Sequence, residues 1–196
     1  GIIHLVSPFT GSGDIPLPVL AEIAHRHDLP VICDAASMVP PRENLTKYLD
    51  EGADIVSFSG GKGMRGPQST GILIGRADLI EAAVANAAPG QFLGRGMKVA
   101  KEEIVGLVTA LKMFVEEDEE AKNGRFREMC QVVVDALIEV PGLKLTIEHD
   151  KYDYLIPTAL MTFTSDWAGP SRDQVCERML QGRPRIALQD LGNPDE

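Results

Sequence analysis

The sequence has few cysteines, and they lie far apart. Cys33, Cys130 and Cys176 are the only three in 196 residues, and no CxxC pair occurs. An odd number of widely spaced cysteines argues against a disulfide framework and is typical of a reducing compartment. The histidines of the stretch 25–27 are too isolated for a zinc site and are expected at a solvated helix end. We therefore expect a cytoplasmic protein without a metal site.

The sequence also lacks an excess of positive charge and any long apolar run. Its 19 lysines and arginines are outnumbered by 29 aspartates and glutamates, for a formal net charge of −10. A field of this sign repels phosphate backbones, which argues against nucleic acid, tRNA included, as a partner. No run approaches the ~18 apolar residues of a membrane span, and no basic and apolar leader is visible. We expect neither a membrane partner nor a signal peptide.

Apolar runs and helical patterns alternate over the first half of the chain. We expect strands at 2–7, 29–36 and 53–59, with helices at 16–27 and 43–51. This spacing of strands and helices predicts crossover units and a parallel sheet. The apolar run 71–75 follows the third strand too closely for a helix to fit between them, so it is expected as an antiparallel neighbour or an edge strand. A helix is expected at 76–88.

The pattern changes from about residue 100, near which we place a domain boundary. A long amphipathic helix is expected at 101–122, with a solvated acidic face at 116–120 and a bend at Asn123-Gly124. The elements expected after it are a helix at 125–140, strands at 143–149, 158–164 and 185–188, and a helix at 171–181. This second part is therefore predicted as an α+β unit.

One lysine, Lys62, stands in the glycine-rich stretch SFSGGKGMRGPQSTG at 57–71. Its glycines spell GxGxxG, but a strand follows where dinucleotide binding needs a helix N-terminus. A phosphate-binding P-loop needs Ser or Thr after the lysine, and glycine follows here. The residues 59–62 also fit the SxxK of β-lactamases, but the SDN and KTG elements of those enzymes are absent. All three of these interpretations are therefore disfavoured.

A Schiff-base lysine fits the stretch better. Lys62 follows the carboxyl end of an expected parallel strand, where open α/β sheets bind ligands, and Asp34 ends the adjacent strand. A carboxylate beside a pyridine nitrogen keeps the ring an electron sink. Arg65 is a cationic neighbour for the amine, and Ser57 and Ser59 offer hydroxyls to a phosphate. Singly, the aspartate could be a loop cap and the lysine a solvated charge, but their occurrence on consecutive strands favours a shared crevice.

Three stretches carry a family resemblance, VICDAAS (31–37), DIVSFSGGKGMRGPQSTGILIGRADLI (54–80) and GRGMKVAKEEIVGLVTAL (94–111). They resemble the selenocysteine-synthase-like group of pyridoxal-phosphate enzymes, of fold type I. That group includes L-seryl-tRNA(Sec) selenium transferases and D-glucosaminate-6-phosphate ammonia-lyases. The similarity runs over essentially the whole chain and is strongest over 29–111.

The resemblance implies pyridoxal 5'-phosphate as the cofactor and gives roles to single residues. Lys62 would hold the cofactor as a Schiff base and later move the substrate proton. Asp34 would pair with the pyridine nitrogen, and Ala36 would lie against the ring. Ser59 would contact the cofactor phosphate, with Ser57 beside it.

The same resemblance implies residues for subunit contacts and for the substrate. Gln68 and Thr70 would reach the site of a neighbouring subunit in a homodimer or higher even homo-oligomer. Arg65 and Arg95 are weaker candidates for binding substrate anions, and a salt bridge or an exposed charge is the alternative role for each. The small-molecule substrate would be an amino compound.

The resemblance also bears on domains and reaction. Residues 1–100 would form the C-terminal part of the large, mostly parallel α/β domain, and 101–196 an incomplete small α+β domain that a long helix enters. Because family members are longer, we expect a fragment that binds the cofactor weakly and is inactive by itself. The expected reaction is elimination of ammonia or water from a small amino-sugar acid or hydroxy-amino acid. The alternatives are selenium transfer on seryl-tRNA, a class V-type aminotransferase and a non-catalytic remnant.

Overall fold

The computed structural model of the protein describes residues 1–7, 15–150 and 154–189. The chain divides into two compact units. The first is Gly1–Asp118 with a short segment that ends at Leu155, and the second is Glu119–Asp150 with Ile156–Glu196. This division falls after Asp118, whereas the sequence interpretation begins the small domain at residue 101. The assignment of a large and a small domain to the chain stays a prediction.

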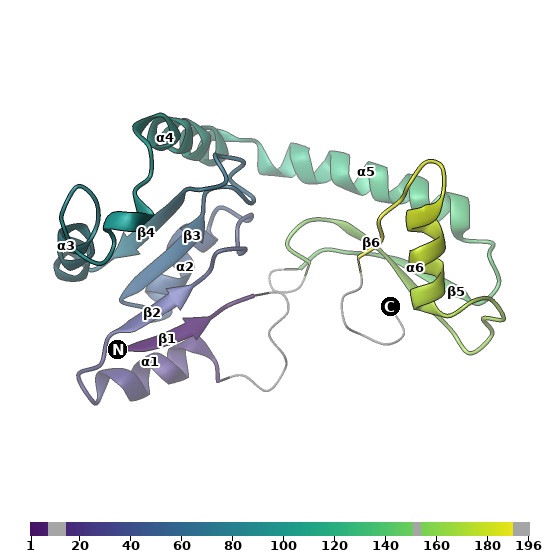
Figure 1. The fold of residues 1–196 in the computed structure, drawn as a ribbon. Coiled ribbons are helices and arrows are strands. Elements are labelled where there is room, and N and C mark those ends of the chain that lie inside the picture. The colour runs from purple at the N-terminus through teal and green to yellow at the C-terminus, as the bar shows by residue number, and fades with distance from the viewer. Residues whose placement is uncertain (8–14, 151–153, 190–196) are drawn as a thin grey trace. The chain divides into compact units, whose positions relative to one another are not determined.

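The first unit is built on one four-stranded sheet (Figure 1). Its strands, in spatial order, are β1 (Ile2–Leu5), β2 (Val31–Asp34), β3 (Ile55–Ser59) and β4 (Gly71–Gly75). The first three are parallel, and β4 is antiparallel to β3. Helices α1 (Leu17–His25) and α2 (Asn44–Asp50) make the two crossovers. The predicted α/β class, the parallel sheet and the antiparallel edge strand are confirmed.

One face of this sheet holds the hydrophobic core. Val31, Cys33, Val56 and Phe58 project from β2 and β3 with at most 2% of their surface exposed. Burial of a large apolar side chain contributes roughly 1.5–3 kcal/mol each. The helices add to the same cluster Leu17, Ala21, Ala24, Tyr48, Leu107 and Phe114. Because side chains alternate along a strand, Asp34 and its neighbours in register lie on the other face.

A buried carboxylate, Asp54, joins three elements just before β3. It accepts a hydrogen bond from the Val31 N–H at 2.7 Å and lies 2.8 Å from both His25 Nε2 and Arg76 Nη1. Burial by itself would raise the pKa of Asp54, but the hydrogen bonds from Arg76, Val31 and His25 outweigh it and lower the pKa. Asp54 therefore ties α1 and the segment after β4 to the amino end of β2.

The first unit continues beyond β4 with two helices and a 3₁₀ turn. Helix α3 (Ala77–Asn86) follows β4 directly, and the 3₁₀ turn is Arg95–Met97. Helix α4 (Lys101–Glu116) then packs Leu107 and Phe114 into the core.

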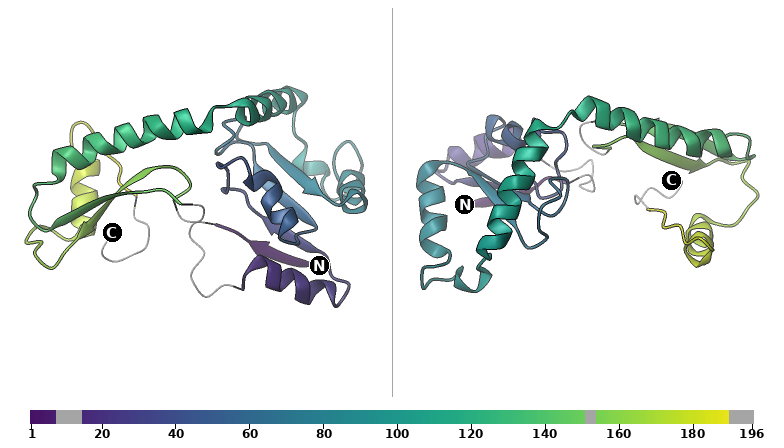
Figure 2. Two further views of the ribbon diagram at one scale, coloured as in Figure 1. Left: turned by 180° about the vertical axis from the view of Figure 1, so that it is seen from behind. Right: turned by 90° about the horizontal axis from the view of Figure 1, so that it is seen from above.

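The second unit is a helix packed on a hairpin. Helix α5 (Glu119–Leu137) contacts both β5 (Leu143–Glu148) and β6 (Thr158–Phe163), which are antiparallel (Figure 2). Helix α6 (Arg172–Gln181) follows, with a Ser171 N-cap that accepts a hydrogen bond from the Gln174 N–H. No helix within the described ranges is long and apolar enough to cross a membrane.

The expected single helix over 101–122 is wrong, because the chain breaks between α4 and α5. Glu117 has an extended backbone, with ψ at 140°. The guanidinium of Arg42 donates to the carbonyl of Val115 and, at 2.9 Å, to that of Glu117, so it fills acceptors that the ended helix leaves open. Carboxylates are unfavourable at a helix C-terminus, where the helix dipole is negative, and favourable at an N-terminus, where it is positive. Glu119 and Glu120 accordingly lie in the first turn of α5.

Two further expectations are wrong in the second unit. Asn123-Gly124 does not bend the chain but lies inside α5, and Asn123 is 6% exposed, so packing overrides its weak helix propensity. Residues 185–188 form no strand in the described structure. The Ile186 N–H instead donates to the carbonyl of Met179 at the end of α6.

Candidate active site

Strands β2 and β3 bring Asp34 and Ser57 together. The two residues are partners in the parallel register. The Ser57 hydroxyl lies 3.4 Å from Asp34 Oδ1, and the Ala36 N–H donates to the same oxygen at 3.1 Å. Within the described residues no donor contacts Oδ2. The half-buried carboxylate is therefore held by one oxygen and offers the other to a ligand.

The turn after β2 places Ala36 beside Ser59, the last residue of β3. The Ala35 N–H donates to the Ser57 carbonyl at 3.0 Å, and the Ser59 N–H donates to the Ala36 carbonyl at 3.3 Å. Asp34, Ala36, Ser57 and Ser59 thus gather at the carboxyl ends of two parallel strands. Open α/β sheets bind ligands at this edge.

Lys62 lies just beyond that edge, in a loop that we call the lysine loop (60–70). The loop closes on itself, because the Gly60 N–H donates to the Thr70 carbonyl at 2.9 Å and the Gly66 N–H to the Gly60 carbonyl at 2.7 Å. Lys62 is exposed. Its amine makes no hydrogen bond or ion pair with any residue of the described ranges. Its Nζ is therefore accessible to a ligand.

Gly63 fixes the path of the lysine loop. A Cβ atom added there would lie 1.8 Å from the carbonyl oxygen of Val39. A contact this short with backbone leaves no room for any side chain. The loop therefore packs tightly on the segment that follows β2.

Gln68 and Thr70 hold the lysine loop within this chain. The Gln68 amide donates to the Gly61 carbonyl at 2.9 Å, from an exposed position. Thr70 is 6% exposed, and its hydroxyl donates to the Pro67 carbonyl at 2.6 Å. Their role toward a neighbouring subunit stays a prediction, and the Thr70 hydroxyl is already used locally.

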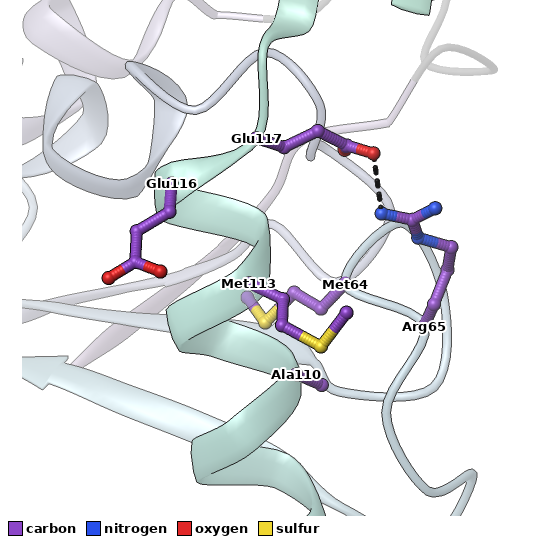
Figure 3. A pocket seen from close by; sticks show the side chains of 6 residues that line it. All are labelled: Met64, Arg65, Ala110, Met113, Glu116 and Glu117. Atoms are coloured by element: carbon purple, nitrogen blue, oxygen red, sulfur yellow. Dashed lines mark hydrogen bonds and ion pairs between the residues drawn. The ribbon is translucent and has the colours of Figure 1, made fainter.

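Among the described residues, neither candidate arginine forms a hydrogen bond or an ion pair with Asp34, Ala36 or Ser57. Arg65 Nη2 lies 2.9 Å from Glu117 Oε1, beside a hollow of about 510 Å³ (Figure 3). Arg95 donates from Nη1 to the Pro89 carbonyl at 3.1 Å, in the segment after α3. Arg65 thus forms a salt bridge, which the sequence analysis gave as the alternative to a substrate-binding role. The substrate role of both arginines stays a prediction.

Sequence reasoning missed the contacts that α4 makes with the lysine loop. The Ser69 hydroxyl donates to Glu103, which also accepts from the Ala100 N–H at 3.1 Å. Both hydrogen bonds lower the pKa of Glu103, and the one from Ser69 has the larger effect. A Glu three residues after the N-cap, which is Ala100 here, is a recognisable capping signal. Nothing in the acidic run marks Glu117 as different from its neighbours.

Cys33 lies next to Asp34 but is no nucleophile. Burial raises the pKa of its thiol to about 12, and the charges of Asp34 and Glu51 add to the effect. A thiol of this kind stays protonated and inert. Cys33 is therefore a side chain of the core.

The sequence of this chain is similar to those of known proteins. The family model described as "SelA: L-seryl-tRNA selenium transferase" matches residues 6–139. A 5'-C-glycyluridine monooxygenase-decarboxylase of Streptomyces sp is 33% identical over 177 residues, which cover 90% of this chain and 42% of that protein. A D-glucosaminate-6-phosphate ammonia lyase of Salmonella typhimurium is 32% identical over 139 residues, which cover 71% of this chain and 34% of that protein.

Solved structures share its fold. The structure of a D-glucosaminate-6-phosphate ammonia-lyase superposes with a TM-score of 0.70 at 26% identity, and covers 98% of this chain. The match takes in 50% of that enzyme, so the chain spans half or less of the length of these relatives. The cysteine desulfurase CsdA from Escherichia coli, at TM-score 0.55 and 22% identity, shows the fold alone. The chain belongs to the L-seryl-tRNA selenium transferase family, within the fold type I group of pyridoxal-phosphate-dependent lyases and transferases.

Proposed function

We propose that this chain carries the chemical lysine and part of the cofactor site of a pyridoxal-phosphate-dependent lyase. Its substrate would be a small amino-sugar acid or hydroxy-amino acid, from which ammonia or water is eliminated. The observation that carries the proposal is the placement of Asp34 at the carboxyl end of β2 and of Lys62 just beyond the carboxyl end of the adjacent parallel strand β3.

The side chains at this edge fit pyridoxal phosphate in their chemistry. Asp34 keeps Oδ2 for a ring N–H, while Ala36 and Ser57 hold Oδ1. The methyl side chain of Ala36 leaves room for a flat ring, and the Ser59 hydroxyl suits a phosphate oxygen. Ser57 would act through Asp34, because its hydroxyl is directed to that carboxylate.

Bound pyridoxal phosphate withdraws electrons from the bonds at the α-carbon of an amino substrate. Asp34 would supply the negative charge that keeps a proton on the ring nitrogen. Lys62 Nζ would attach the cofactor and, when released, take the proton from the substrate α-carbon and return it to the leaving group. The closed lysine loop would keep this amine at the carboxyl end of β3.

The similarity to the solved ammonia-lyase structure supports the choice of reaction, because it extends over 98% of this chain. Selenium transfer on a seryl-tRNA is the second candidate, since the family model carries that name. The net charge of −10 argues against a phosphate backbone on this part of the protein. The Streptomyces relative is named as a monooxygenase-decarboxylase, and the sequence analysis did not consider that type of reaction.

The proposal includes a homodimer or a higher even homo-oligomer. Its support is the exposed position of Gln68 in the lysine loop. From there Gln68, whose amide donates to the Gly61 carbonyl within this chain, would also face a second subunit, as the family resemblance implies.

The test is cofactor capture by the longest natural reading frame that contains this chain. Wild type and Lys62→Ala are mixed with pyridoxal phosphate, their absorbance spectra are recorded, and both are treated with borohydride. We expect a visible band in wild type and a borohydride-fixed label on the Lys62 peptide by mass spectrometry. Equal bands in both proteins, or a label on another lysine, would reject the role of Lys62. A screen of amino-sugar acids for released ammonia then tests the reaction.

A further inference from the structure

Two carboxylates, one in helix α4 and one just after it, hold the second half of the lysine loop. Near the helix start, Glu103 accepts a hydrogen bond from the Ser69 hydroxyl. Just past the helix end, Glu117 pairs with Arg65 at 2.9 Å. Both contacts fall after Lys62, with Arg65 at the middle of the lysine loop and Ser69 next to its last residue.

Between these two contacts the loop and the helix pack closely. A Cβ atom added to Gly106 would lie 2.9 Å from Cγ of Pro67. A Cβ atom added to Gly60 would lie 2.6 Å from Cδ1 of Leu107. The loop therefore follows α4 from Glu103 to the helix end and not only at its two polar contacts.

Arg65 occupies a backbone conformation that favours glycine. Its φ is +60°, in the left-handed region, and its N–H donates to the Lys62 carbonyl at 2.9 Å. Glycine would adopt this conformation more easily, but glycine could not carry a guanidinium to Glu117. Arg65 thus closes the turn that begins at Lys62, and its side chain pairs with Glu117, the residue that follows α4.

Glu117 is itself held in place. Arg42 donates to its carbonyl oxygen at 2.9 Å, and the carboxylate is only 23% exposed. Its neighbour Glu116 is 64% exposed and pairs with Lys112 of the same helix. Figure 3 shows the Glu116 carboxylate directed away from Arg65, while a dashed line joins Arg65 to Glu117.

We propose that Glu103 and Glu117 are positioning residues for Lys62, acting through Ser69 and Arg65. An exposed ion pair by itself contributes little. Two carboxylates that hold one short loop at Arg65 and at Ser69 restrict it before any ligand arrives, so less freedom is lost on binding. This inference rests on the proposed function, in which Lys62 attaches the cofactor.

The experiment uses the longest natural reading frame and two matched pairs of variants. Glu117→Gln is compared with Glu116→Gln, and Glu103→Gln with Glu102→Gln, because each control removes an adjacent exposed carboxylate. Hydrogen–deuterium exchange of residues 60–70 is measured without cofactor, and pyridoxal phosphate affinity is measured by absorbance titration. We expect both Glu117→Gln and Glu103→Gln to speed exchange and to weaken cofactor affinity, each about two- to fivefold, with the controls unchanged.

A double-mutant cycle tests whether Arg65 and Glu117 act as a pair. Arg65→Gln, Glu117→Gln and the double variant should show non-additive losses of affinity, since either single change already breaks the contact. Additive losses, or test variants that behave like their controls, would overturn the proposal. Faster exchange with unchanged cofactor affinity would also overturn it, because the carboxylates would then only stabilise the loop. If wild type captures no cofactor, the proposed function fails, and the exchange still decides whether the carboxylates hold the loop.

Discussion

Ser57 lies beside Asp34 in the register of the parallel strands, and its hydroxyl is 3.4 Å from Asp34 Oδ1. Both residues project from the sheet face opposite the core. The pairing leaves the second carboxylate oxygen to a ligand. Ser57 therefore acts on the orientation of the carboxylate that the proposed chemistry needs.

Removal of the Ser57 hydroxyl should weaken cofactor binding without unfolding the protein. One hydrogen bond contributes about 0.5–1.5 kcal/mol, so Ser57→Ala should raise the Kd for pyridoxal phosphate by about two- to tenfold. Ser57→Thr keeps a hydroxyl and should retain most of the affinity. Absorbance titration measures both. An unchanged Kd in Ser57→Ala would show that Asp34 needs no such support.

A methyl group on Gly63 should displace the lysine loop. The added Cβ would lie 1.8 Å from the Val39 carbonyl oxygen, so backbone must move. Such overpacking typically costs about 1–3 kcal/mol, and Gly63→Ala should lower both Tm and cofactor affinity. Gly96→Ala is the matched control, because nothing lies within 4 Å of its added Cβ. Similar losses in the two variants would contradict the tight contact.

Much of the first unit follows from the sequence, because its strands are short apolar runs separated by helical patterns or, before β4, by a glycine-rich loop. The run at 71–75 has the bounds of β4, and its antiparallel pairing follows from the short connection before it. The helix break at Glu117 does not follow, since the guanidinium of Arg42 that fills the open carbonyls comes from a distant part of the chain. An acidic run alone does not show where its carbonyls find donors.

The candidate site divides in the same way. Asp34 and Lys62 are predictable because strand ends in a parallel sheet meet at one edge. Glu103 and Glu117 are not, because their partners Ser69 and Arg65 belong to the lysine loop and are far from them in sequence. A pattern in sequence reveals side chains on one element, whereas these contacts depend on how two elements pack.

Cys33 should resist alkylation in the folded protein. Its thiol is fully buried, and its pKa is raised to about 12, so at pH 8 roughly one molecule in ten thousand carries the thiolate that reacts. Cys130 and Cys176 are partly exposed and should be labelled first. Peptide mass spectrometry after iodoacetamide treatment measures the order. Early labelling of Cys33 in native protein would contradict the burial.

Because of Asp54, the free energy of unfolding should depend on pH in the acidic range. Its hydrogen bonds lower its pKa in the folded state, so its contribution is fully present above the unfolded pKa of about 3.9 and is lost as the pH falls toward the folded value. Asp54→Asn keeps an acceptor but loses the charge facing Arg76 and His25. The variant should lose about 1.5–3 kcal/mol of unfolding free energy at pH 7.

The pH series gives this last prediction its sharpest form. Urea unfolding is measured for wild type, Asp54→Asn and Asp50→Asn between about pH 7 and pH 3. Wild type should approach Asp54→Asn as the pH falls, because protonation removes the same charge that the substitution removes. Asp50→Asn changes an exposed carboxylate of α2 and should stay near wild type at each pH. A constant gap between wild type and Asp54→Asn would mean that the carboxylate stabilises the sheet by its shape and not by its charge.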